Sequence, residues 1–204
     1  MKLGQRSVAA TVLIVVLGSG IIWWATDGLS AFTAETARRI NILRSPRRLP
    51  AVVLEDQDGR AFRLQDYRGR FLAVEFIYTH CATLCRSQGI AFRQIRDSVP
   101  KRALGRKFAL ISISFDPDRD DLASLKAYGQ AYGADGRYWR IARVRSAADL
   151  RPLLDAFGVV VIPDGLGGFE HNAAIHLIDR DGRLAQISDL DEPTLFVKMI
   201  VQRL

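Results

Sequence analysis

The chain has 204 residues, of which 49% are hydrophobic, and a formal net charge of +7. This length allows one domain of ordinary size together with an appendage. The basic charge comes mainly from arginines scattered along the chain, and such charge can serve an anionic membrane surface or an acidic protein patch. Because we find no recognition-helix pattern, no zinc-finger spacing and no basic stripe interleaved with aromatic residues, we do not expect nucleic-acid binding.

The N-terminal segment is typical of a membrane anchor. Lys2 and Arg6 precede an uncharged stretch from Ser7 to Thr26. Twenty residues in a helix cover roughly 30 Å, which is the thickness of the hydrocarbon core of a bilayer. The stretch is longer than the apolar run of most signal peptides, shows no clear cleavage motif and ends near a pair of tryptophans suited to the membrane interface. We predict an uncleaved signal anchor at residues 1–26, forming a single transmembrane helix.

The next part of the chain is predicted to be a juxtamembrane tether, residues 27–50, with a helix between Ala34 and Leu43. From Ala51 the sequence changes character, and we assign residues 51–204 to one domain. Its first element is a hairpin over residues 52–64, closed by the Asp-Gly pair at 58–59.

The rest of the domain alternates strands with helices. Strands are predicted at 71–78, 108–115, 138–142, 174–178 and 183–187. Helices are predicted from the cysteines to Val99, from a cap at Asp120 or Asp121 to Tyr132, and over 146–157 and 192–204. This order predicts an α/β fold, a mixed sheet flanked by helices on both faces in the thioredoxin-like arrangement.

The chain has only two cysteines, Cys81 and Cys85, and they follow the strand predicted at 71–78. Two cysteines are too few for a disulfide scaffold, and a close pair of this kind more often serves redox chemistry or a metal. In an open α/β sheet ligands bind at the carboxyl ends of strands, and the start of the following helix lowers thiol pKa values. A spacing of i, i+4 puts both sulfurs on one helical face, where they can form a disulfide or bind one metal ion. Two thiolates suit Cu(I), zinc or an iron–sulfur cluster, although two cysteines are too few for the usual cluster.

A third ligand would complete a trigonal copper site, and the chain offers three histidines. His80 is next to Cys81, and its side chain should point away from the two sulfurs. His176 lies inside an apolar strand and is expected to be a satisfied residue of the sheet. His171 ends a glycine-rich loop, residues 165–171, which in a thioredoxin-like sheet packs beside the start of the cysteine-bearing helix. We therefore choose His171 as the third ligand.

These segments resemble the Sco/SenC family of copper-binding proteins. The resemblance runs from about Leu49 to Leu204 and is carried by three segments in order, residues 78–85 with both cysteines, 112–120 with an acidic loop, and 171–179. It implies copper, as Cu(I), Cu(II) or both, bound by Cys81, Cys85 and His171. It also implies a metallochaperone role in building the binuclear copper centre of cytochrome c oxidase.

Two functions remain open on the sequence. In the first, the chain is a copper metallochaperone, which makes no bond in a substrate and is not an enzyme in the usual sense. In the second, it is an extracytoplasmic thiol-disulfide oxidoreductase with a redox-active disulfide, in which Cys81 attacks and Cys85 resolves. A peroxiredoxin-like peroxidase is disfavoured because Thr79 is wrongly spaced from Cys81.

The expected location of the domain follows from the chemistry of the predicted copper site, not from the distribution of Lys and Arg. Lys2 and Arg6 favour a cytoplasmic N-terminus, but the arginines between 38 and 48 compete with them, so the positive-inside rule does not decide. A copper site facing outward agrees with the absence of other cysteines, and no mitochondrial presequence is evident. We expect a single-pass protein of the bacterial inner (cytoplasmic) membrane, with its globular domain in the periplasm.

Overall fold

The structure, a computed structural model, describes residues 2–26, 28, 33–80 and 84–204, with the side chains of all of these except 2–6, 84 and 85. The chain divides into two compact units, Met1–Ser45 and Pro46–Leu204.

The first unit consists of two helices, α1 (Lys2–Ala25) and α2 (Ala34–Arg44). Within α1, the stretch Ser7–Ala25 has a mean hydropathy of 2.2 and is long and apolar enough to cross a membrane. The predicted N-terminal helix is therefore confirmed. The helix expected in the tether is confirmed as well: α2 begins after Thr33, whose side chain accepts a hydrogen bond of 3.1 Å from the backbone N–H of Thr36.

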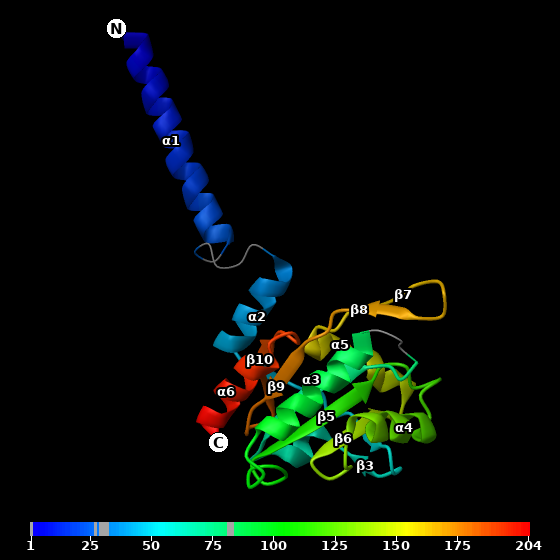
Figure 1. Cartoon of the computed structure of the whole chain (residues 1–204). Coiled ribbons are helices and arrows are strands. Elements are labelled where there is room, and N and C mark those ends of the chain that lie inside the picture. Colours follow the sequence, from blue (N-terminus) through cyan, green and yellow to red (C-terminus); the bar gives the residue numbers. More distant parts are fainter. Residues whose placement is uncertain (1, 27, 29–32, 81–83) are drawn as a thin grey trace. The chain divides into compact units, whose positions relative to one another are not determined.

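The second unit is built on one mixed sheet (Figure 1). In the described residues this sheet has eight strands in the order β1-β10-β9-β4-β5-β6-β2-β3, and β7 and β8 form a separate hairpin. The strands are β1 (Arg47–Arg48), β2 (Leu54–Asp56), β3 (Ala61–Phe62), β4 (Phe71–Ile77), β5 (Phe108–Ser114), β6 (Trp139–Val144), β7 (Val161–Pro163), β8 (Phe169–His171), β9 (Ile175–Ile178) and β10 (Arg183–Ser188). The helices are α3 (Leu84–Ser98), α4 (Leu122–Tyr132), α5 (Leu150–Phe157) and α6 (Pro193–Arg203), with short 3-10 turns at Leu64–Tyr67 and Ala147–Asp149.

Three parallel strands, β4, β5 and β6, form the centre of the sheet. Every residue of β5 is buried, as expected for an apolar strand covered on both faces. Because the strands are parallel, their amino ends share one edge of the sheet and their carboxyl ends share the opposite edge. The carboxyl edge is the one from which the chain continues toward the cysteines.

Helices cover both faces of the sheet, as predicted. Neighbouring residues of a strand point to opposite faces, so Glu75 and Phe76 mark the two sides of β4. On the Glu75 side, Phe92 of α3 packs against Trp139 with ring centroids 6.0 Å apart. On the Phe76 side, the ring of Phe157 of α5 lies 5.0 Å from that of Phe76.

The two Asp-Gly turns predicted from the sequence are confirmed. At each turn an aspartate, Asp56 or Asp179, accepts two backbone N–H groups of the turn through one carboxylate oxygen at 2.9–3.0 Å. Gly59 and Gly182 have φ of +77° and +80°, a conformation that glycine adopts without strain.

The structure differs from the prediction in two places. The segment expected to be a glycine-rich loop before His171 contains the hairpin of β7 and β8, whose turn is held by Asp164, which accepts the N–H groups of Leu166 and Gly168 at 2.7 and 2.9 Å. The tether was expected to extend to residue 50, yet β1 within it pairs with β10 of the large sheet.

Candidate metal site

The predicted cysteine ligands follow β4. Cys81 lies outside the described residues. Cys85 lies in the first turn of α3, and its side chain is not described. The predicted placement of both sulfurs on one face of a helix therefore stays a prediction.

His171, the predicted third ligand, ends β8 and packs against the carboxyl ends of the central strands. Its ring lies 4.9 Å from the ring of Phe115, the residue after β5, and 6.4 Å from that of Tyr78, the residue after β4. Phe169 closes the same group, with its ring 5.3 Å from Tyr78 and 5.6 Å from Phe115. The imidazole is therefore turned inward. It contacts Tyr78, which precedes Cys81 by three residues in the chain.

The environment of His171 favours a neutral imidazole. Both ring nitrogens are buried, and among the described residues no side chain bonds to either, although the backbone of Asn172 interacts with the ring. Burial lowers the pKa of His171, because an apolar surrounding disfavours the charged imidazolium. Buried polar atoms normally have partners, so a buried imidazole without a side-chain partner needs an explanation. A neutral imidazole with a free lone pair is the form that binds a metal ion.

Asp120 fixes the backbone that leads into Cys81. This carboxylate is fully buried, and one of its oxygens accepts the backbone N–H of Thr79 at 2.9 Å and the hydroxyl of Ser114 at 2.5 Å. The other oxygen accepts the hydroxyl of Thr79 at 2.6 Å and lies 3.2 Å from Nδ1 of His80. The carboxylate thus joins the end of β5 to the turn after β4, and it has the partners that a buried charge requires.

The sequence left open whether Asp120 or Asp121 caps the next helix, and the structure assigns the cap to Asp121. Its side chain accepts the N–H of Ser124 at 2.8 Å. The hydrogen bonds lower the pKa of Asp121. Asp120 is the residue whose role the sequence did not reveal, because its donors come from two separate segments and follow no local pattern. His80 is half-exposed and turned to Asp120, so its assignment as a residue next to the site rather than a ligand still stands as a prediction.

Arg119 ties the acidic loop to the hairpin that carries His171. Its guanidinium pairs with the carboxylate of Asp116 and donates to the backbone carbonyl of Gly167 in the β7–β8 turn. It also lies over the ring of Phe169, 5.1 Å from the centroid. The acidic loop therefore contacts both halves of the predicted site, the turn before Cys81 through Asp120 and the His171 hairpin through Arg119.

His176 is a buried residue of the sheet, as expected. It is 1% exposed, its Nδ1 lies 3.3 Å from the carbonyl oxygen of Val74, and its ring packs edge-on against Phe76 and Phe157. This residue lies on the side of the sheet that α5 covers.

One further acid is buried in the sheet. Glu75 has no exposed surface, and burial raises its pKa to about 8, so the side chain is protonated at neutral pH. One oxygen accepts the hydroxyl of Ser112 at 2.5 Å, and that hydroxyl in turn accepts the indole N–H of Trp139 at 2.9 Å. Among the described residues the other oxygen has no partner. In the sequence Glu75 stands out only as an interruption of an apolar strand.

The parallel strands β4 and β5 are joined by the helix α3, which contains Cys85, and the antiparallel hairpin of β9 and β10 follows. Together with helices on both faces of the sheet, these elements define a thioredoxin-like protein. Residues 50–204 match the family model described as SCO1/SenC, so the chain belongs to the SCO1/SenC family. This confirms the resemblance seen in the sequence.

Individual relatives agree with this family assignment. The chain is 24% identical over 132 residues to the SCO1 protein homolog of Bacillus subtilis, an alignment that covers 64% of this chain and 67% of the relative. The solved structure of Bradyrhizobium japonicum ScoI with copper bound is 27% identical, with a TM-score of 0.61, and the match covers 74% of this chain and 98% of that one. A SCO1/SenC family lipoprotein from Bacillus anthracis shares the fold at 24% identity, with a TM-score of 0.65 over 77% of this chain and 98% of the other.

Proposed function

We propose that this chain binds copper through the thiolates of Cys81 and Cys85 and the imidazole of His171, and that it delivers the metal to the binuclear copper centre of cytochrome c oxidase. The observation that carries the ligand assignment is the burial of both His171 ring nitrogens, with no side-chain partner among the described residues, beside the strand end that leads to Cys81. Membership of the SCO1/SenC family and the copper-bound ScoI structure support the choice of metal.

The chemistry of these donors suits a carrier. Two thiolates and an imidazole form a soft site that selects Cu(I) over hard cations. A site with three donors leaves one side open, so a thiolate of the recipient can approach before the donors of this chain are released. Tyr78, Phe115 and Phe169 exclude water on the His171 side, which holds the imidazole in its neutral form.

The rest of the chain fits a membrane-attached carrier. In this proposal residues 1–26 are the anchor, 27–50 the tether, whose strand Arg47–Arg48 joins the sheet, and 51–204 the copper-binding domain, held at the periplasmic side of the inner membrane. The candidate span Ser7–Ala25 supports the anchor. A periplasmic reporter fused after Leu204 is expected to be active, and activity of a cytoplasmic reporter at the same position would contradict the topology.

Copper titration of the purified full chain in detergent tests the ligand set. Under anaerobic conditions and against a Cu(I) chelator, we expect one copper per chain and a loss of at least about a hundredfold in affinity for His171→Ala, because losing a ligand should cost no less than losing a group that orients one. The matched control is His80→Ala, which removes an imidazole that we do not assign as a ligand. Unchanged affinity in His171→Ala would show that His171 is not a ligand.

The alternative function, reduction of disulfides in a partner, uses the same cysteines without His171. The variant His171→Ala distinguishes the two functions, because it is expected to lose copper while retaining dithiol redox activity. For delivery itself, the copper-loaded chain is mixed with the apo copper domain of the oxidase subunit, and the absorption of the binuclear centre is followed. Reduction of that domain without copper transfer would favour the oxidoreductase.

A further inference from the structure

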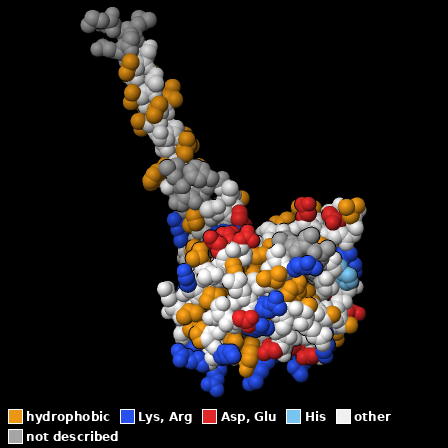
Figure 2. All heavy atoms as spheres, viewed as in Figure 1, with side chains coloured by type: hydrophobic (Ala, Val, Ile, Leu, Met, Phe, Trp, Pro, Cys, Tyr) orange, Lys and Arg blue, Asp and Glu red, His pale blue; other side chains and the backbone are white. Residues whose placement is uncertain are grey.

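Basic side chains gather at the amino edge of the central strands, opposite to the candidate metal site. Arg70, Arg106 and Arg137 lie one or two residues before β4, β5 and β6 respectively, and the turn after α3 adds two more. The five residues form what we call the basic edge: Arg70, Lys101, Arg102, Arg106 and Arg137. Figure 2 shows that Lys and Arg side chains predominate along the lower rim of the globular unit. Charge that is dispersed in the sequence is thus concentrated in space.

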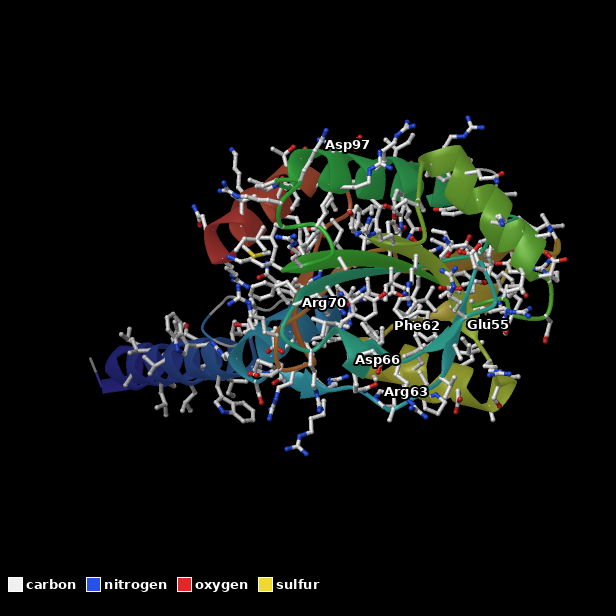
Figure 3. The ribbon with its side chains drawn as sticks, turned by 90° about the horizontal axis from the view of Figure 1, so that it is seen from below. Glu55, Phe62, Arg63, Asp66, Arg70 and Asp97 are labelled. Carbon is white, nitrogen blue, oxygen red and sulfur yellow. The ribbon has the colours of Figure 1, made fainter. Side chains whose placement is uncertain are left out.

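These cations have no acidic partners within the described residues. No ion pair forms between the basic edge and a described carboxylate, and Arg70 donates instead to the carbonyl oxygens of Gly105 at 3.2 Å and Asp66 at 3.0 Å. The nearby carboxylates have other partners. Asp66 accepts the backbone N–H of Arg63, and Asp97 pairs with Arg96 at 2.7 Å. In Figure 3 Asp97 lies near the end of α3, away from Arg70, and it lines a neighbouring hollow with Lys101 without forming an ion pair with it.

The surface between the cations is hollowed and partly apolar. A hollow of about 570 Å³ is lined by all five residues of the basic edge together with Leu104, Gly105 and Tyr138. A second hollow of about 330 Å³ shares Arg102 and Arg106 and is otherwise lined by Pro100, Ala103, Lys107, Val201 and Leu204. Val201 is 41% exposed. Guanidinium groups that alternate with apolar side chains suit an amphipathic ligand, one that has phosphate groups next to hydrocarbon.

We propose that the basic edge binds the anionic phospholipid headgroups of the membrane that holds the N-terminal anchor. This goes beyond copper binding and does not depend on it. The same chain contains the candidate span Ser7–Ala25, so a bilayer surface lies within reach of the domain at high effective concentration. Within the described residues the five cations have no carboxylate partner, so none of their charge is neutralised by an ion pair. An anionic surface attracts such residues additively.

Binding at this edge would orient the metal site. The candidate site follows the carboxyl ends of β4 and β5, and these strands of 7 residues each begin at the basic edge. At about 3.3 Å per residue the two edges are roughly 20 Å apart. A domain held to the membrane by its basic edge therefore presents Cys81, Cys85 and His171 away from the lipid, toward a recipient that projects from the membrane.

Hydrogen exchange of the full chain in lipid nanodiscs tests this proposal. We compare discs of phosphatidylcholine with discs that also contain phosphatidylglycerol, and follow the peptide that covers residues 100–107. Because each basic residue near an anionic surface strengthens binding about fivefold, exchange in this peptide is expected to slow at least about fivefold in the anionic discs. High salt should remove the difference, since it screens surface charge.

Two variants with the same change in net charge sharpen the test. Lys101→Glu/Arg102→Glu/Arg106→Glu is expected to abolish the lipid-dependent protection. Arg63→Glu/Arg93→Glu/Arg145→Glu, which changes exposed arginines outside the basic edge, is expected to retain it. Equal exchange of the unmodified chain in both kinds of disc would overturn the proposal. Equal protection by soluble inorganic phosphate in phosphatidylcholine discs would also overturn it, because it would indicate a small-anion site instead.

Discussion

The two edges of the central strands treat charge in opposite ways. At the carboxyl edge, Asp120 is fully buried and accepts hydrogen bonds from two segments, and Arg119 is paired with Asp116. At the amino edge, the described basic residues have no carboxylate partners. Charge satisfied internally fixes geometry, whereas charge left without partners is available to an external ligand. The carboxyl edge is therefore built as a rigid site, and the amino edge as a surface for association.

The largest effect is expected from the cysteines. Replacing both Cys81 and Cys85 with Ser removes two of the three proposed ligands. We expect copper affinity to fall by at least about ten thousandfold, since each lost ligand should cost no less than the roughly hundredfold of a group that orients a ligand. Competition titration of the full chain measures this change. The basic-edge variant is the matched comparison, and it is expected to bind copper as the unmodified chain does.

Asp120→Ala tests whether the carboxyl edge is held rigid from within. The substitution leaves Thr79 and Ser114 without their buried acceptor, so we expect the free energy of unfolding to fall by about 3 kcal/mol. Copper affinity should fall by roughly tenfold or more, since groups that orient ligands matter nearly as much as ligands. Denaturant unfolding and copper titration of the same preparation measure both quantities. Asp121→Ala is the control: it removes a helix cap, so we expect a cost of about 1 kcal/mol and no change in copper affinity.

Glu75, midway between the two edges, predicts a dependence of stability on pH. Its pKa is raised from 4.5 to about 8 in the folded chain. Between these values the unfolded chain loses the proton while the folded chain keeps it, so Glu75 lowers stability as pH rises by up to roughly 1.4 kcal/mol per pH unit. Above pH 8 both states are ionised and the dependence ends.

Glu75→Gln keeps an acceptor for Ser112 but does not titrate. The difference in unfolding free energy between the variant and the unmodified chain should therefore shift in favour of the variant from pH 5 to pH 8, and then level off. Denaturant unfolding across this pH range measures the shift. A constant difference at all pH values would show that Glu75 is ionised in the folded chain.

The fold was largely predictable because its signals are local. Apolar runs marked β4 and β5, Asp-Gly pairs marked two hairpins, and the uncharged N-terminal stretch marked α1. The β7–β8 hairpin was missed because its glycines indicate a loop, although the apolar residues before Asp164 and at Phe169 are also compatible with strands. The pairing of β1 with β10 joins segments far apart in the chain, and no periodicity signals it.

The site was predictable only in part. His171 was chosen for its expected place in a loop beside the cysteine-bearing helix, whereas the structure puts it at the end of β8, and its role as a ligand stays a prediction. The role of Asp120 could not be predicted, since it depends on donors from Thr79 and Ser114 that only the folded chain brings together. The basic edge was hidden for the same reason: its five residues come from three separate segments that meet because β4, β5 and β6 are parallel.

X-ray absorption spectroscopy of the Cu(I)-loaded full chain tests the ligand assignment most directly. We expect two sulfur neighbours and one imidazole nitrogen around the metal, with the nitrogen lost in His171→Ala and retained in His80→Ala. A shell made of sulfur alone, or a nitrogen signal that persists in His171→Ala, would contradict the proposed site.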